Sequence, residues 1–424
     1  MFGWEFPPHK SGGLGTACHG LTKALACFPD VEVLFVVPKA WGDEDQCGIT
    51  FLGADGIPVI RKLIQFPDMG SKVAYYEFNA ELIPYLGTNE FNELKTSFSS
   101  GENRLTEFTE EGKIIFEGGY GPGLFQEIQR YALVAETIAR ELDFDVIHVH
   151  DWMTFPAGMA AKQISGKALV VHIHSTDFDR SGNQVNPLIC AIEKEGMEIA
   201  DKIIAVSDFT RNALIRNYHI DPGKVTTVCN AVEPFNAEFI HGRTKTGDEK
   251  IVTFLGRITM QKGPGYFMDA AARVLEEMKN VRFVMAGNGD MLNAMKVRAA
   301  ELNIAEYFDF PGFLNDGEVP GLFRMSDVFV MPSVSEPFGI VALEAMQMEV
   351  PVIISKQSGV SEVLKNVLKV DYWDIRAMAD AICKVLNDKV LRNNLIEKGK
   401  KEVGLLTWKN AASKVRAVYF DLLT

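Results

Sequence analysis

The sequence predicts an α/β protein of two similar domains, each built on a doubly wound parallel sheet. Short β-branched runs alternate with helical patterns, and this rhythm occurs twice along the chain. A polar stretch at residues 241–250 separates the two sets of elements, and 424 residues are enough for about two domains. We therefore predict an N-terminal domain at residues 1–235 and a C-terminal domain at residues 236–406, with the carboxyl edges of their sheets facing one cleft.

Four buried parallel strands are expected in the first domain. Each is a nearly continuous apolar run, which is typical of a strand covered on both faces. These runs lie at residues 31–37, 145–149, 168–173 and 202–206, and helical patterns lie at 16–28, 125–142 and 187–200. Residues 40–123 fit the rhythm poorly, because only 72–78 has a clear strand pattern. This insertion either builds a substrate-binding wall or is an irregular structural loop.

The second domain repeats the pattern. Its strands are expected at residues 251–255, 281–286, 328–331 and 350–355, with helices that include 266–279 and 339–348. In open parallel sheets, ligands bind beyond the carboxyl ends of the strands, where backbone N–H groups and helix N-termini converge. Polar or glycine-rich residues that follow a strand are therefore the candidates for a site.

Charge and cysteine usage exclude several functions. The formal net charge is −13, so a nucleic acid or an anionic bilayer is repelled at long range, and we expect neither a nucleic-acid partner nor a membrane span. The first eight residues have no basic flank and no apolar signal-peptide core, so a cytoplasmic location is expected. The 6 cysteines form no C-x-x-C pair, which disfavours a structural zinc site.

Two glycine-containing loops are candidates for phosphate binding. Residues 10–15 read K-S-G-G-L-G and open a helical pattern, so the backbone of Gly12 and Gly13 can approach a phosphate or a sugar; a tight structural turn is the alternative. Residues 256–263 follow a strand and carry Arg257 and Lys262. Two cations at a strand end favour an anion such as a diphosphate, and a solvated basic loop is the alternative.

A third candidate is the pair Glu336 and Glu344. Pro337 suits the first position of a helix, which puts Glu336 just outside the helix and Glu344 within it. Eight residues of helix span about 12 Å, too far for two carboxylates that act on one glycosidic bond, which lie about 5 Å apart in retaining glycosidases. This spacing instead suits a carboxylate at each end of an extended ligand, against the alternative of two solvated side chains.

Histidines follow the first-domain strands. His148 and His150 share one strand face, so metal ligation has to be considered, but no third ligand has suggestive spacing. We expect His150 to be a hydrogen-bonding group at the sheet edge and His148 to be a satisfied buried histidine. The polar residues 172–180 follow the next strand and offer further polar groups to the cleft, with structural hydrogen bonding as the alternative. The three D-x-D triplets, at residues 43–45, 143–145 and 177–179, do not follow a Val/Ile-rich strand as a metal-binding triplet would, and we expect no metal.

Taken in chain order, these motifs resemble the retaining glycosyltransferases of the two-Rossmann GT-B fold, specifically the glycogen/starch synthase-like group. The resemblance covers nearly the whole chain. It rests on the segments K-S-G-G-L-G at 10–15, H-D-W at 150–152, G-R to K-G at 256–263, G-N-G at 287–289, E-P-F-G at 336–339 with Glu344, and S-G-V at 358–360.

The resemblance implies a role for each matching residue. Arg257 and Lys262 would bind the donor diphosphate, Glu336 the transferred sugar, Glu344 the ribose, and His150 the 6-hydroxyl of the sugar. Further substrate-binding residues would be Lys10, Gly12, Gly13, Asp151, Gly287, Gly339, Ser358, Gly359 and Val360. Residues 407–424 resemble the last helix of the family, which returns to the first domain. No cofactor and no enzyme nucleophile are implied.

The function that this resemblance implies is transfer of glucose from ADP-glucose or UDP-glucose to an α-1,4-glucan acceptor. One alternative is a hexosyltransferase that acts on a lipid-linked or small acceptor in envelope polysaccharide synthesis. Another is a catalytically silent glucan-binding homologue. The choice between adenine and uracil, the acceptor length, the oligomeric state and any effector are not readable from these motifs.

The chain departs from the family pattern at two places. Only residues 1–4 precede the glycine-rich loop where the family has a full strand, so a truncated central strand is expected. Glu349 occupies a position that is usually glycine. If its φ is positive, the conformation costs about 1–2 kcal/mol of stability and leaves the chemistry unaffected.

Overall fold

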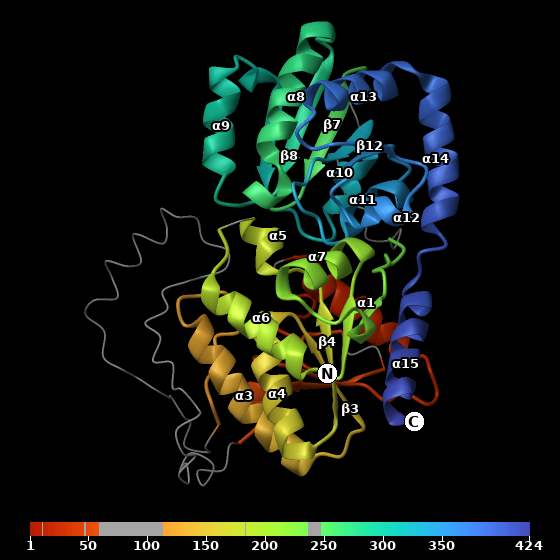
Figure 1. Ribbon diagram of the computed structural model, residues 1–424. Helices are drawn as coiled ribbons and strands as arrows, with labels where there is room; N and C mark the ends of the chain where they lie inside the picture. The colour runs from red at the N-terminus through yellow and green to blue at the C-terminus, as the bar shows by residue number, and fades with distance from the viewer. Residues whose placement is uncertain (11, 46–47, 59–112, 183, 236–246) are drawn as a thin grey trace, which may run out of the picture.

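The computed structural model describes residues 1–10, 12–45, 48–58, 113–182, 184–235 and 247–424 (Figure 1). The strand expected at residues 72–78 lies outside these ranges, as does much of the insertion at 40–123. In the described part of the chain, strands and helices alternate as the sequence predicts, and the strands form parallel sheets in two regions of the molecule. Within this part, no helix is both long and apolar enough to cross a membrane.

Parallel strands in the first region pair in the order β3-β4-β5-β6, next to a β1-β2 pair. The bounds are β1 Leu34–Val37, β2 Thr50–Gly53, β3 Val146–His150, β4 Ala168–Ile173, β5 Lys202–Ala205 and β6 Val225–Thr227. Helices cover both faces of the sheet. They are α1 Gly13–Leu25, α3 Leu124–Glu141, α4 Phe155–Ser165, α5 Asp177–Ser181, α6 Pro187–Ile199, α7 Asp208–Tyr218 and α15 Trp408–Leu423.

The start of the chain joins β1 to β3. Phe2 forms parallel bridges with both Val36 and Val149. Its N–H donates to the carbonyl of His148 at 2.8 Å, and the N–H of Gly3 donates to that of Val36 at 2.9 Å. Residues 2 and 3 therefore pair with β1 on one side and with β3 on the other. These few residues complete the ladder, because each backbone group needs a partner when it is buried between two strands.

Two apolar cores lie on the two faces of this sheet. One is formed with α3, α4 and α6, and the other with α1 and α15. Trp408 of α15 packs so tightly against α1 that a Cβ on Gly20 would lie 2.3 Å from its indole ring. Arg416 and Asp30 form an ion pair at the same interface. The C-terminal helix thus lies on the first domain beside α1, as Figure 1 shows.

The second sheet has the strand order β12-β11-β10-β7-β8-β9, and all pairs are parallel. The bounds are β7 Lys250–Leu255, β8 Val281–Ala286, β9 Phe308–Gly312, β10 Val328–Met331, β11 Val352–Ser355 and β12 Leu368–Val370. Its helices are α8 Pro264–Glu277, α9 Leu292–Glu301, α10 Val319–Met325, α11 Ile340–Gln347, α12 Val360–Val363, α13 Ile375–Asn387 and α14 Lys389–Val403. Short 3-10 turns in the described part of the chain are η1 Ala54–Gly56, η4 Trp152–Thr154, η5 Pro222–Lys224, η7 Met260–Lys262 and η8 Ala305–Tyr307. The sequence analysis did not predict β9 and β12, nor β2 and β6 in the first region.

Helix α11 begins later than the sequence predicts. Pro337 was expected at the first helical position, but α11 begins at Ile340 with Gly339 as its N-cap at φ 110°. The backbone before the helix pairs with the loop after β11 instead: Glu336 forms a bridge with Ser358, and the carbonyl of Phe338 accepts a hydrogen bond from the N–H of Val360. The prediction for Pro337 is therefore wrong, because contacts with a neighbouring loop hold residues 336–338 outside the helix.

Glu349 lies between α11 and β11 with φ 61°, so the left-handed conformation expected there is confirmed. A non-glycine residue in this conformation costs about 1–2 kcal/mol. The Glu349 carboxylate lies 2.5 Å from the Lys400 ammonium, but both side chains are exposed, and such a pair contributes about 1 kcal/mol at most.

We predict that Glu349→Gly raises the free energy of unfolding by up to about 1 kcal/mol, since relief of the φ strain outweighs the lost ion pair and the added freedom of the unfolded chain. Chemical denaturation measures it. Glu349→Ala is the control, because it removes the carboxylate but keeps the Cβ, and it should not stabilise. A Gly variant no more stable than the Ala variant would contradict the prediction.

Candidate functional site

Carboxyl ends of both sheets meet where the two domains touch. The loop before α1 lies against the loop after β7: a Cβ on Gly12 would lie 2.9 Å from Nη2 of Arg257. Lys10 reaches the second domain as well, with its Nζ 3.0 Å from Oδ1 of Asp316. The glycine-rich loop and the basic loop, which the sequence singled out separately, therefore form one site.

Helix α1 begins at Gly13, three residues earlier than the helical pattern indicates. Gly13 thus belongs to the first turn, whose N–H groups have no partner within the helix. One of them is used locally, because the N–H of Gly15 donates to Oε1 of Glu5 at 3.0 Å. Glu5 is buried and also accepts a hydrogen bond from the Tyr120 hydroxyl. The sequence analysis missed this carboxylate, because no motif marks it.

Lys262 and Glu336 form the central ion pair. The Lys262 Nζ lies 2.7 Å from Oε2 of Glu336, and the Ser333 hydroxyl donates to the same oxygen at 3.0 Å. Glu336 is buried and Lys262 is partly exposed. Two residues 74 positions apart, each predicted from a different motif, are thus in direct contact. A cation and a carboxylate can separate when an anion and a hydroxyl-rich ligand enter between them.

Glycines hold these loops close together. Gly287 has φ 134°, and a Cβ there would lie 1.8 Å from the carbonyl oxygen of Gly256, so the G-N-G segment packs directly on the loop that carries Arg257. A Cβ on Gly359 would lie 2.1 Å from the carbonyl oxygen of Pro337. Gly287 and Gly359, both predicted as binding residues, therefore also set the shape of the site.

Glu344 lies on α11 and is half-buried. Loss of hydration raises the pKa of its carboxyl group to about 7, and the nearby Lys10 ammonium partly opposes this shift. Lys10 belongs to the first domain, so the electrostatic environment of Glu344 depends on contact between the domains. Lys10 also donates to the hydroxyl of Thr16 at 2.6 Å.

His150 ends β3, as predicted, and its side chain has no exposed surface. Its Nδ1 lies 3.0 Å from Nε2 of His174, while its Nε2 is buried with no hydrogen-bond partner among the described residues. Both ring nitrogens of His148 have partners, His172 at 3.2 Å and Tyr419 at 2.5 Å. His148 is thus the satisfied buried histidine that was expected.

The structure brings four histidines together, at positions 148, 150, 172 and 174. Burial lowers the pKa of His148, His150 and His172 well below its ordinary range, and that of His174 to about 3, so all four rings are neutral at pH 7.

Two groups of three potential ligands, His148-His150-His172 and Cys18-His150-His174, each have atoms within 4.8 Å of one another. No residue spacing in the sequence indicated a third ligand. Three pairs of the rings are stacked at 17–23°, and two pairs are joined by hydrogen bonds. Stacked rings do not aim their lone pairs at one point about 2 Å away, as zinc requires, so we interpret the cluster as a hydrogen-bonded ladder.

Asp151 links the ends of β3 and β4. It has φ 61°, and its Oδ1 accepts from the N–H of His174 at 2.7 Å and of Ser175 at 3.3 Å. Burial raises the pKa of this carboxyl group to about 7. The carboxylate is thus engaged with the backbone of residues 174–175, the segment that leads into α5. This geometry points to a supporting role in addition to the substrate contact that the motif implies.

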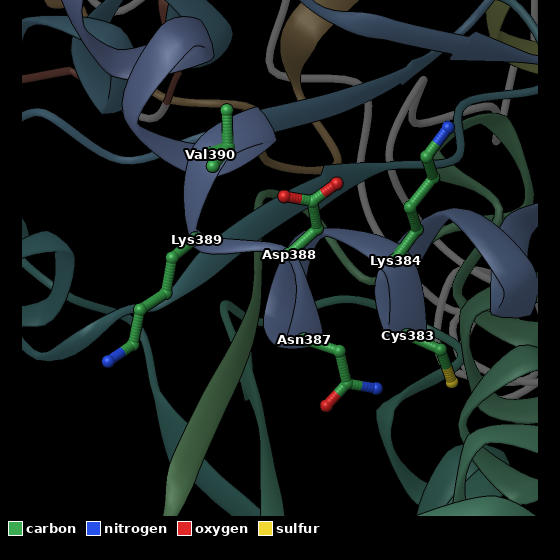
Figure 2. Close-up of a pocket in the computed structure, with 6 residues that line it drawn as sticks. All are labelled: Cys383, Lys384, Asn387, Asp388, Lys389 and Val390. Atoms are coloured by element: carbon green, nitrogen blue, oxygen red, sulfur yellow. The ribbon is translucent and has the colours of Figure 1, made fainter.

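A surface hollow at the turn from α13 to α14 is lined by Cys383, Lys384, Asn387, Asp388, Lys389 and Val390 (Figure 2). The labelled side chains point in different directions and do not converge. This turn follows the C-terminal end of α13, whereas the cleft lies at the carboxyl ends of the strands, where α13 begins. The candidate site is therefore the contact region between the domains.

Comparisons with known proteins agree with this architecture. A family described as "Glycosyl transferases group 1" matches residues 236–402, and "Glycosyltransferase Family 4" matches residues 102–234. An uncharacterized glycosyltransferase of Methanocaldococcus jannaschii is 33% identical over 294 residues, which cover 65% of this chain and 75% of that protein.

Two further relatives have assigned activities. The UDP-Gal:α-D-GlcNAc-diphosphoundecaprenol α-1,3-galactosyltransferase of Escherichia coli is 27% identical over 66% of this chain and 76% of its own length. The glycogen synthase of Mycobacterium tuberculosis is 24% identical over 99% of this chain and 93% of its own.

Solved structures show the same fold over the full chain. Sucrose-phosphate synthase from Thermosynechococcus elongatus has a TM-score of 0.71 at 19% identity, covering 97% of this chain and 94% of that one. HepE from Anabaena, in complex with UDP-glucose, has a TM-score of 0.66 at 16% identity, covering 97% of both chains. With two parallel Rossmann-like sheets and matches to group 1 and family 4 sequences, the chain belongs to the family 4 (group 1) glycosyltransferases of the GT-B fold.

Proposed function

We propose that the protein transfers a hexose from a nucleoside-diphosphate sugar, with retention of configuration, to a lipid-linked or small acceptor in surface polysaccharide synthesis. The observation that carries the transfer chemistry is the convergence of Arg257, the Lys262–Glu336 pair and the glycine-rich loop at the domain contact. Supporting this acceptor class, the E. coli relative is named for a diphosphoundecaprenol-linked acceptor. A UDP-sugar donor is supported by the same name and by the UDP-glucose complex of HepE.

In the proposed mechanism, Arg257 and Lys262 bind the donor diphosphate together with backbone N–H groups of Gly12, Gly13 and residues 358–360. Negative charge grows on the diphosphate as the bond to the sugar breaks, so cations placed at the phosphates lower the barrier. A donor phosphate oxygen takes the proton of the acceptor hydroxyl, which attacks the face that the nucleotide leaves. The positive charge comes from the two side chains, and we propose that catalysis uses no metal.

The Lys262–Glu336 pair stabilises the site when no donor is bound. A buried carboxylate without a partner is costly, and Lys262 supplies the partner when no ligand is present. When a diphosphate attracts Lys262, hydroxyl groups of the sugar can donate to Glu336 in its place. His150 would contact the sugar through its unpartnered Nε2, which requires a change in its present burial.

A second candidate function is glucose transfer to an α-1,4-glucan. It is supported by the match to a glycogen synthase over 99% of the chain and by the net charge of −13, which disfavours approach to an anionic bilayer. The two candidates share the donor chemistry and differ in the acceptor.

The proposal predicts acceptor-dependent nucleotide release in EDTA. UDP-glucose, UDP-galactose and ADP-glucose are each incubated with glycogen, with a GlcNAc-diphosphate lipid analogue, or without acceptor. Release stimulated by the lipid analogue supports the main proposal, and release stimulated by glycogen moves the assignment to the glucan synthase. Arg257→Ala should reduce the rate by about 10²-fold, the usual effect of losing one electrostatic contact to a transition state. No release in any mixture from the folded wild type would contradict both.

A second prediction concerns the contact between Gly12 and Arg257. Gly12→Ala places a Cβ 2.9 Å from the guanidinium, whereas a Cβ on Gly13 meets nothing within 4 Å. Gly12→Ala should displace Arg257 and reduce turnover by about tenfold or more, by loss of part of its electrostatic stabilisation. Gly13→Ala, which changes the same loop without this clash, should have a smaller effect. Equal rates for the two variants would mean that the position of Arg257 does not limit turnover.

The raised pKa of Glu344 predicts a pH dependence of nucleotide binding. Below about pH 7 the carboxyl group is protonated, so the form that accepts hydrogen bonds from ribose hydroxyls is lost as the pH falls. The affinity for UDP should decrease by up to about tenfold between about pH 8 and pH 6, as expected for a group with this pKa. Calorimetry measures it, with Glu344→Gln as the control that lacks the titrating group. The same pH slope in both proteins would contradict the ribose assignment.

A further inference from the structure

The segment that carries Glu336, residues 335–338, lies between the two domains and contacts both. Its backbone contacts within its own domain are made with the loop after β11. The N–H of Glu336 donates to the carbonyl of Gln357 at 3.0 Å, and the Glu336 carbonyl accepts from Gly359 at 2.8 Å. These bonds attach the segment to the donor-side sheet but leave Ser335 and the carbonyl of Pro337 free to face the first domain.

The first domain holds the segment at both of these points. The Ser335 hydroxyl donates to Oδ1 of Asp179 at 2.6 Å. On the other side, the Ser207 hydroxyl donates to the carbonyl of Pro337 at 2.6 Å, and Thr210 approaches the same oxygen at 3.3 Å. Glu336 lies between the two contacts. Its backbone is therefore fixed from the first domain on either side, one residue away in each direction.

Asp179 is itself rigidly held. Its second oxygen accepts from both the N–H and the hydroxyl of Thr176 at 2.8 Å, which forms the capping box at the start of α5. Asp177 and Arg180 fasten α5 to buried Glu193. Helix α5 also contacts η7, which carries Lys262. It thus adjoins both partners of the Lys262–Glu336 pair.

Ser207 is equally constrained. It is fully buried at the N-cap of α7, where its oxygen accepts from the N–H of Thr210 at 3.0 Å. Gly359 fills the space beside it, since a Cβ at that position would lie 2.5 Å from Cβ of Ser207. The Ser207 hydroxyl lies 2.6 Å from the carbonyl oxygen of Pro337 and 3.0 Å from the hydroxyl oxygen of Thr210 in its own helix, so the shorter contact is the one made across the domains. The bond to Pro337 forms only when the two domains are in contact.

From these contacts we propose that Asp179 and Ser207 are positioning residues: they fix Glu336 in its working position only when the domains are closed. The proposal rests on the proposed role of Glu336 in binding the transferred sugar. It gives the D-F-D triplet at 177–179 a role in domain closure, in place of the metal role that the sequence analysis rejected. The physical consequence is that an open, donor-bound enzyme lacks an assembled site, which limits loss of the donor to water.

The test removes one hydroxyl. Ser335→Ala deletes the bond to Asp179 and leaves Glu336 and Lys262 intact. Ser326→Ala is the control, because both contacts of its hydroxyl lie within the second domain, with the Leu322 carbonyl at 2.9 Å and the Thr253 hydroxyl at 2.6 Å. Ser335→Thr keeps a hydroxyl and should restore function. For each protein the UDP affinity, kcat, donor KM, the share of nucleotide released without transfer, and the UDP-dependent decrease in the radius of gyration by X-ray scattering are measured.

Ser335→Ala should bind UDP within about threefold of wild type, lose about tenfold in kcat, and compact less with UDP; hydrolysis of the donor should fall together with transfer, because both need the assembled site. These values are expected because the variant loses one hydrogen bond, from Ser335 to the Asp179 carboxylate, and this bond forms only in the closed state. Asp179→Asn combined with Ser335→Ala should lose less than the sum of the two single effects, since both remove one contact. If Ser335→Ala matches Ser326→Ala in kcat and hydrolysis, or if it loses UDP affinity in proportion to kcat, the positioning role is overturned.

The scattering measurement separates this inference from the proposed function. If wild type releases no nucleotide from any donor, the proposed function fails, but compaction is still measurable. If UDP then decreases the radius of gyration of wild type but not of Ser335→Ala, the result supports the role of the Ser335–Asp179 contact in domain closure. An equal decrease in both proteins would overturn that role.

Discussion

The ion pair between Lys262 and the buried Glu336 is the interaction around which the rest of the candidate site is arranged. Each partner comes from a loop after a different strand of the second sheet, and the Ser333 hydroxyl gives Glu336 a second hydrogen bond. A buried carboxylate is tolerated only with such partners. The glycine contacts at positions 287 and 359, and the two first-domain contacts on either side of Glu336, all serve to keep these loops close enough for the pair to form.

This arrangement divides the work between the domains. The second domain supplies the charged groups, whereas the first supplies a glycine loop that lies against Arg257 and the hydrogen bonds that hold residues 335–337. Neither domain alone presents the complete set. Lys10 adds an electrostatic link, because it comes from the first domain and its ammonium group partly opposes the rise in the pKa of Glu344 in the second. A site assembled in this way requires contact between the domains, which is made through a small number of directed polar contacts.

Much of the fold was predictable from the sequence, because buried parallel strands appear in it as continuous apolar runs. The short strands β9 and β12 were missed since Phe308–Gly312 includes a proline and a glycine and Leu368–Val370 has only three residues. Among the candidate residues that motifs singled out, the structure places Gly12 against Arg257 and Lys262 against Glu336. Asp179 was named only within the polar run 172–180 and the D-x-D triplet 177–179, and Ser207 and Ser335 were not singled out, because a single serine or aspartate carries no pattern, and its partner lies more than 100 residues away. The start of α11 was misplaced because tertiary contacts at Pro337 override its preference for a helical N-terminus.

Two residues with a left-handed backbone, Asp151 and Glu349, differ in their relation to the candidate site. Asp151 and Glu349 both have φ 61°, and each is a non-glycine residue in the left-handed region. Asp151 is buried at the carboxyl end of β3, and the same conformation lets its carboxylate accept two backbone N–H groups at the end of β4. Strain there is offset by hydrogen bonds that shape the cleft wall leading to α5. Glu349 lies before β11, at the opposite edge of its sheet, and its exposed partner Lys400 contributes little. The left-handed conformation therefore shapes the candidate site at Asp151, whereas at Glu349 it only lowers the stability of the fold.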